Sequence, residues 1–283
     1  MVTSADVSQF LFTVKSSSNY DFTNYSEKSI QRRVEKLLID YGMDLTTISN
    51  KIRNDKIFLE KVIKDITVNT TELFRDPQVW INLKYRILPQ FRIQKTIFIW
   101  HAGCSTGQEV YSMLILLNEL DLLDKAKIYA TDINEDVIEK AKKGVYPYLF
   151  NLNYLENFDK VIKTNPYNFE EQNNVPFEKY FDIDRNKDTI TVKPFLQDRV
   201  VYRKHDLVTD DNIFYSKFDI ILCRNVIIYF NSVLQNRVLE MCSNNLYKGG
   251  YLVLGLHEGI LGSVANGFER VRGIYKKKPN SLF

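Results

Sequence analysis

Small residues make up the segment Ala102-Gly-Cys-Ser-Thr-Gly107, which follows a short apolar run at 97–100. Such a loop lets the backbone turn sharply and approach a ligand closely, and a helix starting after it offers unpaired N–H groups. The segment lacks the full Gly-x-Gly-x-x-Gly spacing of the dinucleotide fingerprint, which counts against a nicotinamide enzyme. By itself it indicates either a nucleotide-binding loop or a tight turn.

Two acidic residues stand near this loop in the chain. Asp132 ends the next apolar run, about as far downstream as the acidic residue that binds ribose hydroxyls in Rossmann proteins. The alternative is that Asp132 only begins the cap of a helix starting at Asn134. Glu109 falls in the first turn of the helix after the loop, where it either stabilises the helix dipole or contacts the cationic end of a ligand. Both pairs of alternatives stay open.

Two later segments also follow expected strands. Asp206 and Leu207 come after the run at 200–202, where they suit the amine and the ring of an adenine, although alone they indicate a solvated turn. Asn225 follows the apolar run at 218–223 and can donate and accept at once, as an amino-acid group requires. Tyr229 is either part of the core or part of this site.

A polar connector precedes the loop in the chain. Asn69, Thr71 and Arg75 combine short hydrogen-bonding side chains with a fixed cation, directly before Asp76 and Pro77, which are typical of a helix N-cap and first turn. Helical spacing then continues up to Pro89. Alone, the connector is an ordinary linker.

The elements that would position these residues follow from hydrophobic periodicity. Residues 28–41 form an amphipathic helix ended by Gly42, and strands alternate with helices from residue 97 onward. Residues 146–195 interrupt the alternation without a long periodic helix, and 180–184 and 189–192 flank a polar turn that predicts a hairpin. We therefore expect an α/β, Rossmann-like sheet with a small all-helical N-terminal domain and an inserted small β-subdomain. The expected division is 1–68 (helical domain), 69–90 (linker and connecting helix) and 91–283 (α/β domain, insertion at about 150–195).

Composition limits the classes of function. The chain has 283 residues and a net charge of +3, too weak to indicate a nucleic-acid partner. Its three cysteines and three histidines lack the spacing of a metal site, so we expect no metal. No stretch approaches the roughly 20 apolar residues of a membrane span, and the chain start does not resemble a signal peptide. The expected location is the cytoplasm, without insertion into a membrane.

Together, four segments resemble the CheR chemotaxis receptor methyltransferases: residues 69–77 (Asn-Thr-Thr-Glu-Leu-Phe-Arg-Asp-Pro), 100–112, 130–133 (Ala-Thr-Asp-Ile) and 223–230 (Cys-Arg-Asn-Val-Ile-Ile-Tyr-Phe). The resemblance runs in order from about residue 20 to the C-terminus. It implies S-adenosylmethionine as cofactor, S-adenosylhomocysteine as product, and glutamate side chains in the cytoplasmic helical domain of a chemoreceptor as substrate.

The resemblance also implies roles for the residues singled out above. Asn69, Thr71 and Arg75 would contact the cofactor from the linker, and Glu109 and Asp132 would hold its amino-acid and ribose parts. In the same way, Asp206 and Leu207 would border the adenine, Arg224 and Asn225 would complete the pocket, and Arg75 and Tyr229 would face the methyl-transfer region as catalytic residues.

The chain departs from the family pattern in three places. Where the family has an acidic pair and a proline after the glycine, this chain has Gln108-Glu109-Val110. Where relatives often have Gly-His-Ser-Glu, it has Gly255-Leu-His-Glu258. The expected hairpin also lacks the glycines of relatives that dock on a receptor's C-terminal peptide. The resemblance assigns no role to Gly255-Leu-His-Glu258. The basic stretch from Arg32 to Lys36 is interpreted as a solvated helix face rather than a receptor contact.

A glutamate substrate would need little chemical help from the enzyme. Its reference pKa lies near 4.3, so it is already a carboxylate at neutral pH and requires no general base. We expect Arg75 to orient the substrate carboxylate or the cofactor, and Tyr229 to position the methyl group. Two alternatives stay open: a methyltransferase of RNA or small molecules, and a regulator that binds S-adenosylmethionine without turnover.

Overall fold

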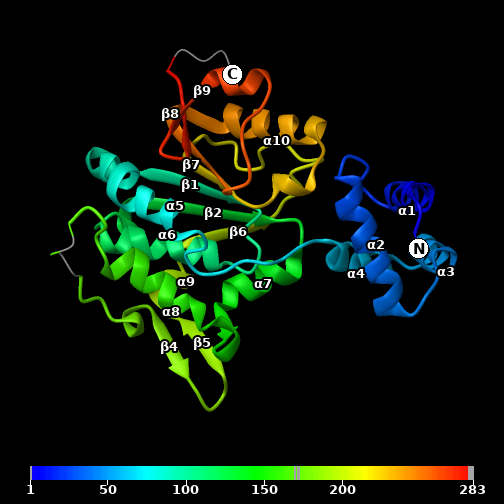
Figure 1. Cartoon of the computed structure of the whole chain (residues 1–283), viewed down its shortest axis with the longest axis horizontal. Helices are drawn as coiled ribbons and strands as arrows, with labels where there is room; N and C mark the ends of the chain where they lie inside the picture. Colours follow the sequence, from blue (N-terminus) through cyan, green and yellow to red (C-terminus); the bar gives the residue numbers. More distant parts are fainter. Residues whose placement is uncertain (1, 169, 171–172, 280–283) are drawn as a thin grey trace.

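The computed structural model describes residues 2–168, 170 and 173–279. An N-terminal helical unit stands beside a larger sheet unit, and an extended segment leads from one to the other (Figure 1). The helical unit consists of α1 Ser4–Ser17, α2 Glu27–Tyr41, α3 Leu45–Asn54 and α4 Lys56–Ile66. Its apolar stripes pack into a core of their own, in which Val34, Ile48 and Val62 are fully buried.

Local residue preferences explain where these helices begin and end. Asp44 accepts the N–H of Thr47 in the first turn of α3, and Asp55 does the same for Phe58 in α4. Gly42 ends α2 in the left-handed conformation, with φ of 60°, which glycine adopts without a steric penalty. The predicted end of this helix is confirmed.

The connecting helix begins at the predicted position, with Asp76 as the N-cap residue and Pro77 in the first turn, but it ends differently from the prediction. Asp76 has a left-handed backbone, with φ of 58°, and its side chain makes no capping hydrogen bond. Helix α5 Pro77–Asn82 continues as a π-helical turn, Leu83–Ile87, and a 3-10 segment, Leu88–Ile93, instead of ending before Pro89. Pro89 fits because it lies in the first turn of the 3-10 segment, where an N–H has no helical partner to lose.

The sheet unit contains a seven-stranded sheet in the order β6-β2-β1-β7-β8-β10-β9. The strands are β1 Ile97–Ala102, β2 Ala126–Asp132, β6 Val200–Lys204, β7 Phe218–Cys223, β8 Leu246–Leu254, β9 Phe268–Val271 and β10 Ile274–Lys277. The first five run parallel to one another, whereas β10 is antiparallel to both β8 and β9. The predicted Rossmann-like sheet is confirmed, and the β9–β10 hairpin is an addition to it.

The sheet separates two cores, because successive residues of a strand point to opposite faces. On β1, Ile99 belongs to one core and Trp100 to the other. Helix α6 Gln108–Glu119 contributes to the first core and α10 Ser232–Asn245 to the second, while α7 Glu135–Lys143 packs beside β2 and β6 (Figure 1). Since the strand order reverses at β1, a ligand crevice is expected at the carboxyl ends of β1 and its neighbours.

A second, three-stranded sheet lies between α7 and β6 in the chain, in the order β3-β5-β4. Antiparallel pairing of β4 Phe181–Asp184 with β5 Thr189–Val192 confirms the predicted hairpin. The third strand and the helices of this insertion were not predicted: β3 Val145–Pro147, α8 Asn153–Phe158 with its π-helical extension Asp159–Lys163, and α9 Pro194–Gln197. Within the described residues, no helix is both long and apolar enough to cross a membrane.

Candidate cofactor and methyl-transfer pocket

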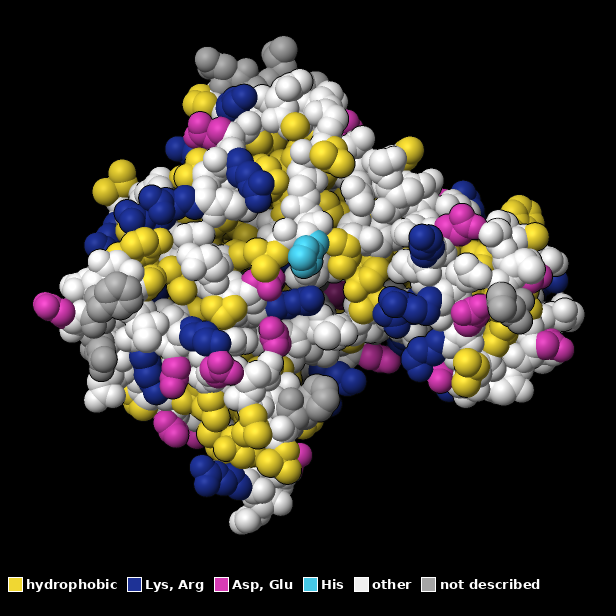
Figure 2. All heavy atoms as spheres, in the orientation of Figure 1, with side chains coloured by type: hydrophobic (Ala, Val, Ile, Leu, Met, Phe, Trp, Pro, Cys, Tyr) yellow, Lys and Arg dark blue, Asp and Glu magenta, His cyan; other side chains and the backbone are white. Residues whose placement is uncertain are grey.

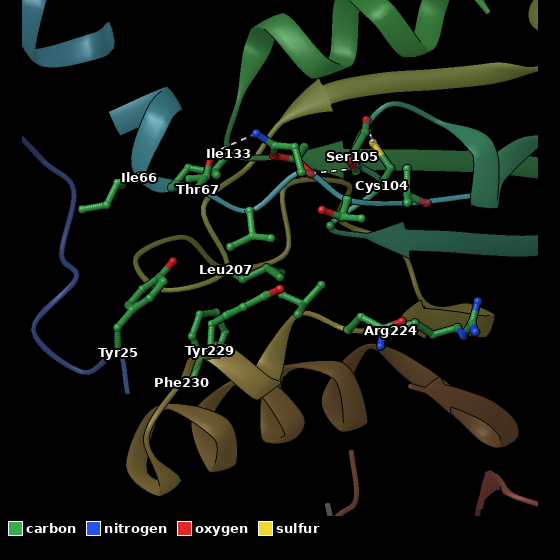
Figure 3. Close-up of a pocket in the computed structure, with 18 of the residues that line it drawn as sticks. Tyr25, Ile66, Thr67, Cys104, Ser105, Ile133, Leu207, Arg224, Tyr229 and Phe230 are labelled. Atoms are coloured by element: carbon green, nitrogen blue, oxygen red, sulfur yellow. Dashed lines mark hydrogen bonds between the residues drawn. The ribbon is translucent and has the colours of Figure 1, made fainter. Parts of the chain in front are cut away.

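A hollow of about 1050 Å³, its open mouth included, lies at the carboxyl ends of β1, β2, β6 and β7 (Figure 3). All the site residues predicted from the sequence line it: Asn69, Thr71, Arg75, Glu109, Asp132, Asp206, Leu207, Arg224, Asn225 and Tyr229. The structure therefore brings together five segments that lie between residues 69 and 229 of the chain.

The glycine loop forms the floor of this pocket. Gly103 and Cys104 donate their N–H groups to the carbonyl of Thr131, at 2.9 and 2.8 Å, which ties the loop to the end of β2. Gly103 has φ of 88°, and a Cβ there would meet Cγ2 of Val226 at 2.5 Å. Glycine is required at this position both for its conformation and for the close approach of the neighbouring segment.

Asp132 joins the loop to the pocket. Its carboxylate accepts the N–H of Ser105 at 2.8 Å and that of Asn134 at 3.0 Å, and the residue is 8% exposed. Burial raises the pKa of Asp132 above its ordinary value, although the N–H donors oppose this shift. The cap of α7 is Asn134 itself, which accepts the N–H of Asp136. Asp132 therefore holds the turn before the helix and lines the pocket as well, so the two alternatives are not exclusive.

The turn after β6 folds back on itself beside Asp132. Asp206 accepts the N–H of Val208 at 2.8 Å, and its own N–H donates to the carboxylate of Asp210 at 2.9 Å. Burial raises the pKa of Asp206 as well. Leu207 is buried and presents an apolar surface to the pocket (Figure 3). The solvated-turn alternative is wrong for this segment.

Arg224 lies at the centre of a buried ionic network. Its guanidinium donates to the carboxylates of Asp76 at 2.9 Å and Glu109 at 3.2 Å, and to the carbonyl of Arg75 at 2.8 Å, while its side chain is 1% exposed. The other oxygen of Glu109 lies 2.9 Å from Nδ1 of His101. Burial alone would raise the pKa of Glu109, but the bond to His101 and the charge of Arg224 outweigh it and lower that pKa. Glu109 thus pairs with both His101 and Arg224 at the edge of the pocket.

The linker and Tyr229 supply the remaining predicted residues. The Arg75 guanidinium donates to the carbonyl of Thr70 at 3.2 Å, and the Asn69 amide donates to the hydroxyl of Thr67 at 3.3 Å. Tyr229 is half-buried, packs against the second core and extends its ring into the pocket (Figure 3). It is therefore both a core residue and a pocket residue.

The N-terminal helical unit closes the pocket from one side, which was not predicted. Tyr25 packs edge-on against Phe230 with ring centroids 4.9 Å apart, and the N–H of Ser26 donates to the carbonyl of Tyr229 at 2.7 Å. Arg33 of α2 also lines the pocket, and among the described residues its buried Nε has no hydrogen-bond partner. Arg32 is exposed, whereas Arg33 is half-buried in the pocket wall, so the basic stretch is not solvated throughout. These contacts depend on how the helical unit docks on the sheet unit, which the local sequence pattern does not predict.

The residues present fit S-adenosylmethionine. The glycine loop leaves room for close approach of a ligand backbone, Asp132 faces the pocket with a carboxylate, and Leu207 offers an apolar wall. The described residues include no group of three or more His, Cys, Asp and Glu side chains placed to hold a metal ion.

Comparison with known proteins identifies the class. Residues 69–275 match the family model described as "CheR methyltransferase, SAM binding domain". The chain is 31% identical over 256 residues to the chemotaxis protein methyltransferase of Borreliella burgdorferi (85% of this chain, 84% of the relative). It is 27% identical over 278 residues to that of Listeria innocua (95% and 96%). A solved O-methyltransferase family protein from Burkholderia thailandensis aligns over 89% of this chain and 72% of its own, with 10% identity and a TM-score of 0.40.

The fold, the pocket and the family match define an S-adenosylmethionine-dependent methyltransferase. The chain belongs to the CheR family of chemotaxis methyltransferases. The two alternatives left open by the sequence, an RNA or small-molecule enzyme and a non-catalytic regulator, are not favoured.

Cofactor affinity should fall as the pH is lowered. Burial raises the pKa values of Asp132 and Asp206, so these carboxylates take up protons at a higher pH than exposed ones. Each protonation removes a charged acceptor from the pocket, and one coupled proton weakens binding by at most about tenfold per pH unit below that pKa. Calorimetric titration with S-adenosylhomocysteine from neutral pH down to about pH 4, the ordinary pKa of an aspartate, measures this, with Asp132→Asn as the comparison. An affinity that is constant over this range would contradict the expectation.

Proposed function

We propose that the enzyme transfers the methyl group of S-adenosylmethionine to glutamate side chains in the cytoplasmic helical domain of a chemoreceptor, which forms glutamate methyl esters. The observation that carries the proposal is the convergence of every predicted site residue on one pocket in a chain of this family. A cytoplasmic location and a division of the chain into residues 1–68, 69–90 and 91–283 belong to the same proposal.

The chemistry of the pocket suits a carboxylate nucleophile. S-adenosylmethionine supplies an electrophilic methyl group on a sulfonium sulfur. A glutamate side chain is already ionised at neutral pH, so it needs alignment rather than deprotonation. Burial raises the pKa of the Cys104 thiol well above its ordinary value, so this pocket residue stays protonated and does not compete as a nucleophile. Alignment of the reacting atoms can contribute roughly 7–11 kcal/mol to lowering the barrier.

The site residues then fall into two groups by role. For binding, we assign Asp132 to the ribose hydroxyls, Asp206 and Leu207 to the adenine, and Asn69, Thr71, Glu109, Arg224 and Asn225 to the remainder of the cofactor pocket. For catalysis, we assign Arg75 to orienting the substrate carboxylate or the cofactor, and Tyr229 to positioning the methyl group. Arg224 supports this assignment of Arg75, because its bond to the Arg75 carbonyl fixes the linker backbone.

Charge at the pocket mouth supports an acidic protein partner. Lys and Arg side chains gather on the N-terminal helical unit where it borders the sheet unit (Figure 2). Arg33 lies in the pocket itself, and Arg32 is exposed on the same helix. A helical segment that carries glutamates would meet favourable potential here, which raises the association rate and favours such partners.

Methyl transfer to receptor glutamates is tested directly with labelled cofactor. Incubation of the enzyme with methyl-labelled S-adenosylmethionine and receptor cytoplasmic fragments should label the fragments, and the label should leave as methanol in base, as expected of a carboxyl ester. Fragments whose candidate glutamates are replaced by alanine serve as the control. Base-stable label, or label that persists in the alanine fragments, would contradict the proposal.

A further inference from the structure

We infer that Glu258 is a positioning residue for methyl transfer, because its carboxylate holds the segment from Asn225 to Tyr229 that forms one wall of the pocket. The inference rests on the proposed function where turnover is concerned, and on the pocket alone where cofactor binding is concerned. Glu258 itself is not among the pocket-lining residues. It acts from behind the wall.

The Glu258 carboxylate is surrounded by backbone donors. One oxygen accepts the N–H of Gly255 and that of Asn225, each at 2.7 Å, and the other accepts the N–H of Ile228 at 3.1 Å. The residue is 9% exposed, so water competes little for these bonds. Two of the donors, Asn225 and Ile228, belong to the segment after β7, and the third, Gly255, directly follows β8. A single side chain therefore connects two strand ends that are about thirty residues apart in sequence.

The Glu258 carboxylate helps to fix the backbone of Asn225. The φ of 59° at Asn225 places it in the left-handed region, which is costly for most residues other than glycine and is better tolerated by asparagine. The bond from its N–H to Glu258 holds this conformation in place. This conformation turns the chain so that Asn225 and Tyr229 both line the pocket.

Gly255 makes this arrangement sterically possible. A Cβ at this position would lie 2.8 Å from the Glu258 carboxylate, 2.9 Å from the Asn225 amide nitrogen and 3.0 Å from the Asn225 backbone nitrogen. The segment Gly255-Leu-His-Glu258 differs from the family pattern Gly-His-Ser-Glu at its two middle positions, and it keeps the glycine and the glutamate. Their contacts give that segment a role, namely to fix the geometry of the neighbouring wall.

Displacement of this wall would affect the glycine loop too. Val226 follows Asn225 and packs so closely on Gly103 that no Cβ fits between them. A shift of the segment therefore changes the floor and the wall of the pocket together. The effect should be largest at the cofactor and the reacting atoms, which lie directly against this wall.

Two substitutions test the inference by different routes. Glu258→Gln keeps the size of the side chain but places an amide N–H₂ against a backbone N–H, and Gly255→Ala keeps the carboxylate but displaces it. Glu269→Gln is the matched control, because Glu269 is an exposed glutamate on β9 of the same sheet. For each protein we would measure the thermal unfolding midpoint, the Kd for S-adenosylhomocysteine, and kcat and KM with the receptor fragment.

We expect both variants, when folded, to lose tenfold or more in affinity for S-adenosylhomocysteine or in kcat, while KM for the receptor fragment stays within about twofold. A purely structural role would lower the unfolding midpoint and leave the cofactor affinity and kcat of the folded protein unchanged. Wild-type affinity and kcat in a folded variant, or a loss confined to receptor KM, would overturn the inference. If Glu258→Gln does not fold, the affinity and kcat of Gly255→Ala test the inference instead. If wild-type enzyme leaves the receptor unmethylated, the proposed function fails and the affinity measurement still tests Glu258.

Discussion

Replacement of Arg224 by alanine should lower the free energy of unfolding by about 3–5 kcal/mol, the usual effect of removing one partner from a buried ion pair. The guanidinium is nearly inaccessible and donates to Asp76, Glu109 and the carbonyl of Arg75. Its loss leaves Glu109 buried with His101 as its remaining partner, and it releases the linker backbone. We expect cofactor affinity to fall with stability, because the same linker lines the pocket.

Chemical denaturation of Arg224→Ala and wild-type enzyme measures the first effect, and calorimetry with S-adenosylhomocysteine measures the second. Arg237→Ala on α10 is a matched control, since Arg237 is exposed. Arg224→Lys should recover little, because one ammonium group cannot reproduce the fork of a guanidinium that bonds several acceptors. An Arg224→Ala protein within about 1 kcal/mol of wild type would show that the network contributes little to stability.

Tyr229→Phe should lower kcat by roughly 10-fold to 100-fold, the scale of effect expected when reacting groups are misaligned by about an ångström. The ring lies in the pocket, and its backbone carbonyl accepts the N–H of Ser26, a bond that the substitution leaves intact. The phenylalanine variant therefore removes the hydroxyl and keeps the packing. Cofactor affinity should stay close to wild type.

Steady-state methylation of the receptor fragment, together with cofactor titration, checks this prediction. Tyr247→Phe is a suitable control, because Tyr247 is 42% exposed on β8 and lies outside the pocket lining. A Tyr229→Phe enzyme with normal kcat would remove the catalytic role from the hydroxyl. Tyr229 would then serve only as packing in the pocket wall.

The convergence of the site could be predicted because parallel strands order their ends. Asp132, Asp206 and Asn225 each follow a short apolar run, and parallel runs that belong to one sheet place such residues at one edge. The fully buried β7 illustrates why such strands can be recognised: a strand covered on both faces is mostly apolar, and Asp219 is the one charged residue in β7. The β9–β10 hairpin carries a weaker signal, a short alternation around Arg272 and Gly273, and was missed.

Contacts between distant segments could not be predicted in the same way. Asp76 next to Pro77 has the local pattern of an N-cap, yet its carboxylate pairs with Arg224, 148 positions away. The contacts of Tyr25 and Arg33 with the pocket depend on how the helical unit docks, and amphipathic periodicity shows only that each helix has a buried face. Long-range ion pairing and docking are set by the whole fold rather than by neighbouring residues.

The closure of the pocket by the N-terminal helical unit bears on which part of the chain can be exchanged between relatives without altering the cofactor site. The match to the family model begins at residue 69, whereas Tyr25, Arg33 and residues 66–68 also line the pocket. An exchange of the first 68 residues between relatives would therefore transplant a piece of the cofactor enclosure along with the outer surface. In chimaeras of this family, we therefore expect the rate of cofactor exchange and the choice of partner to change together.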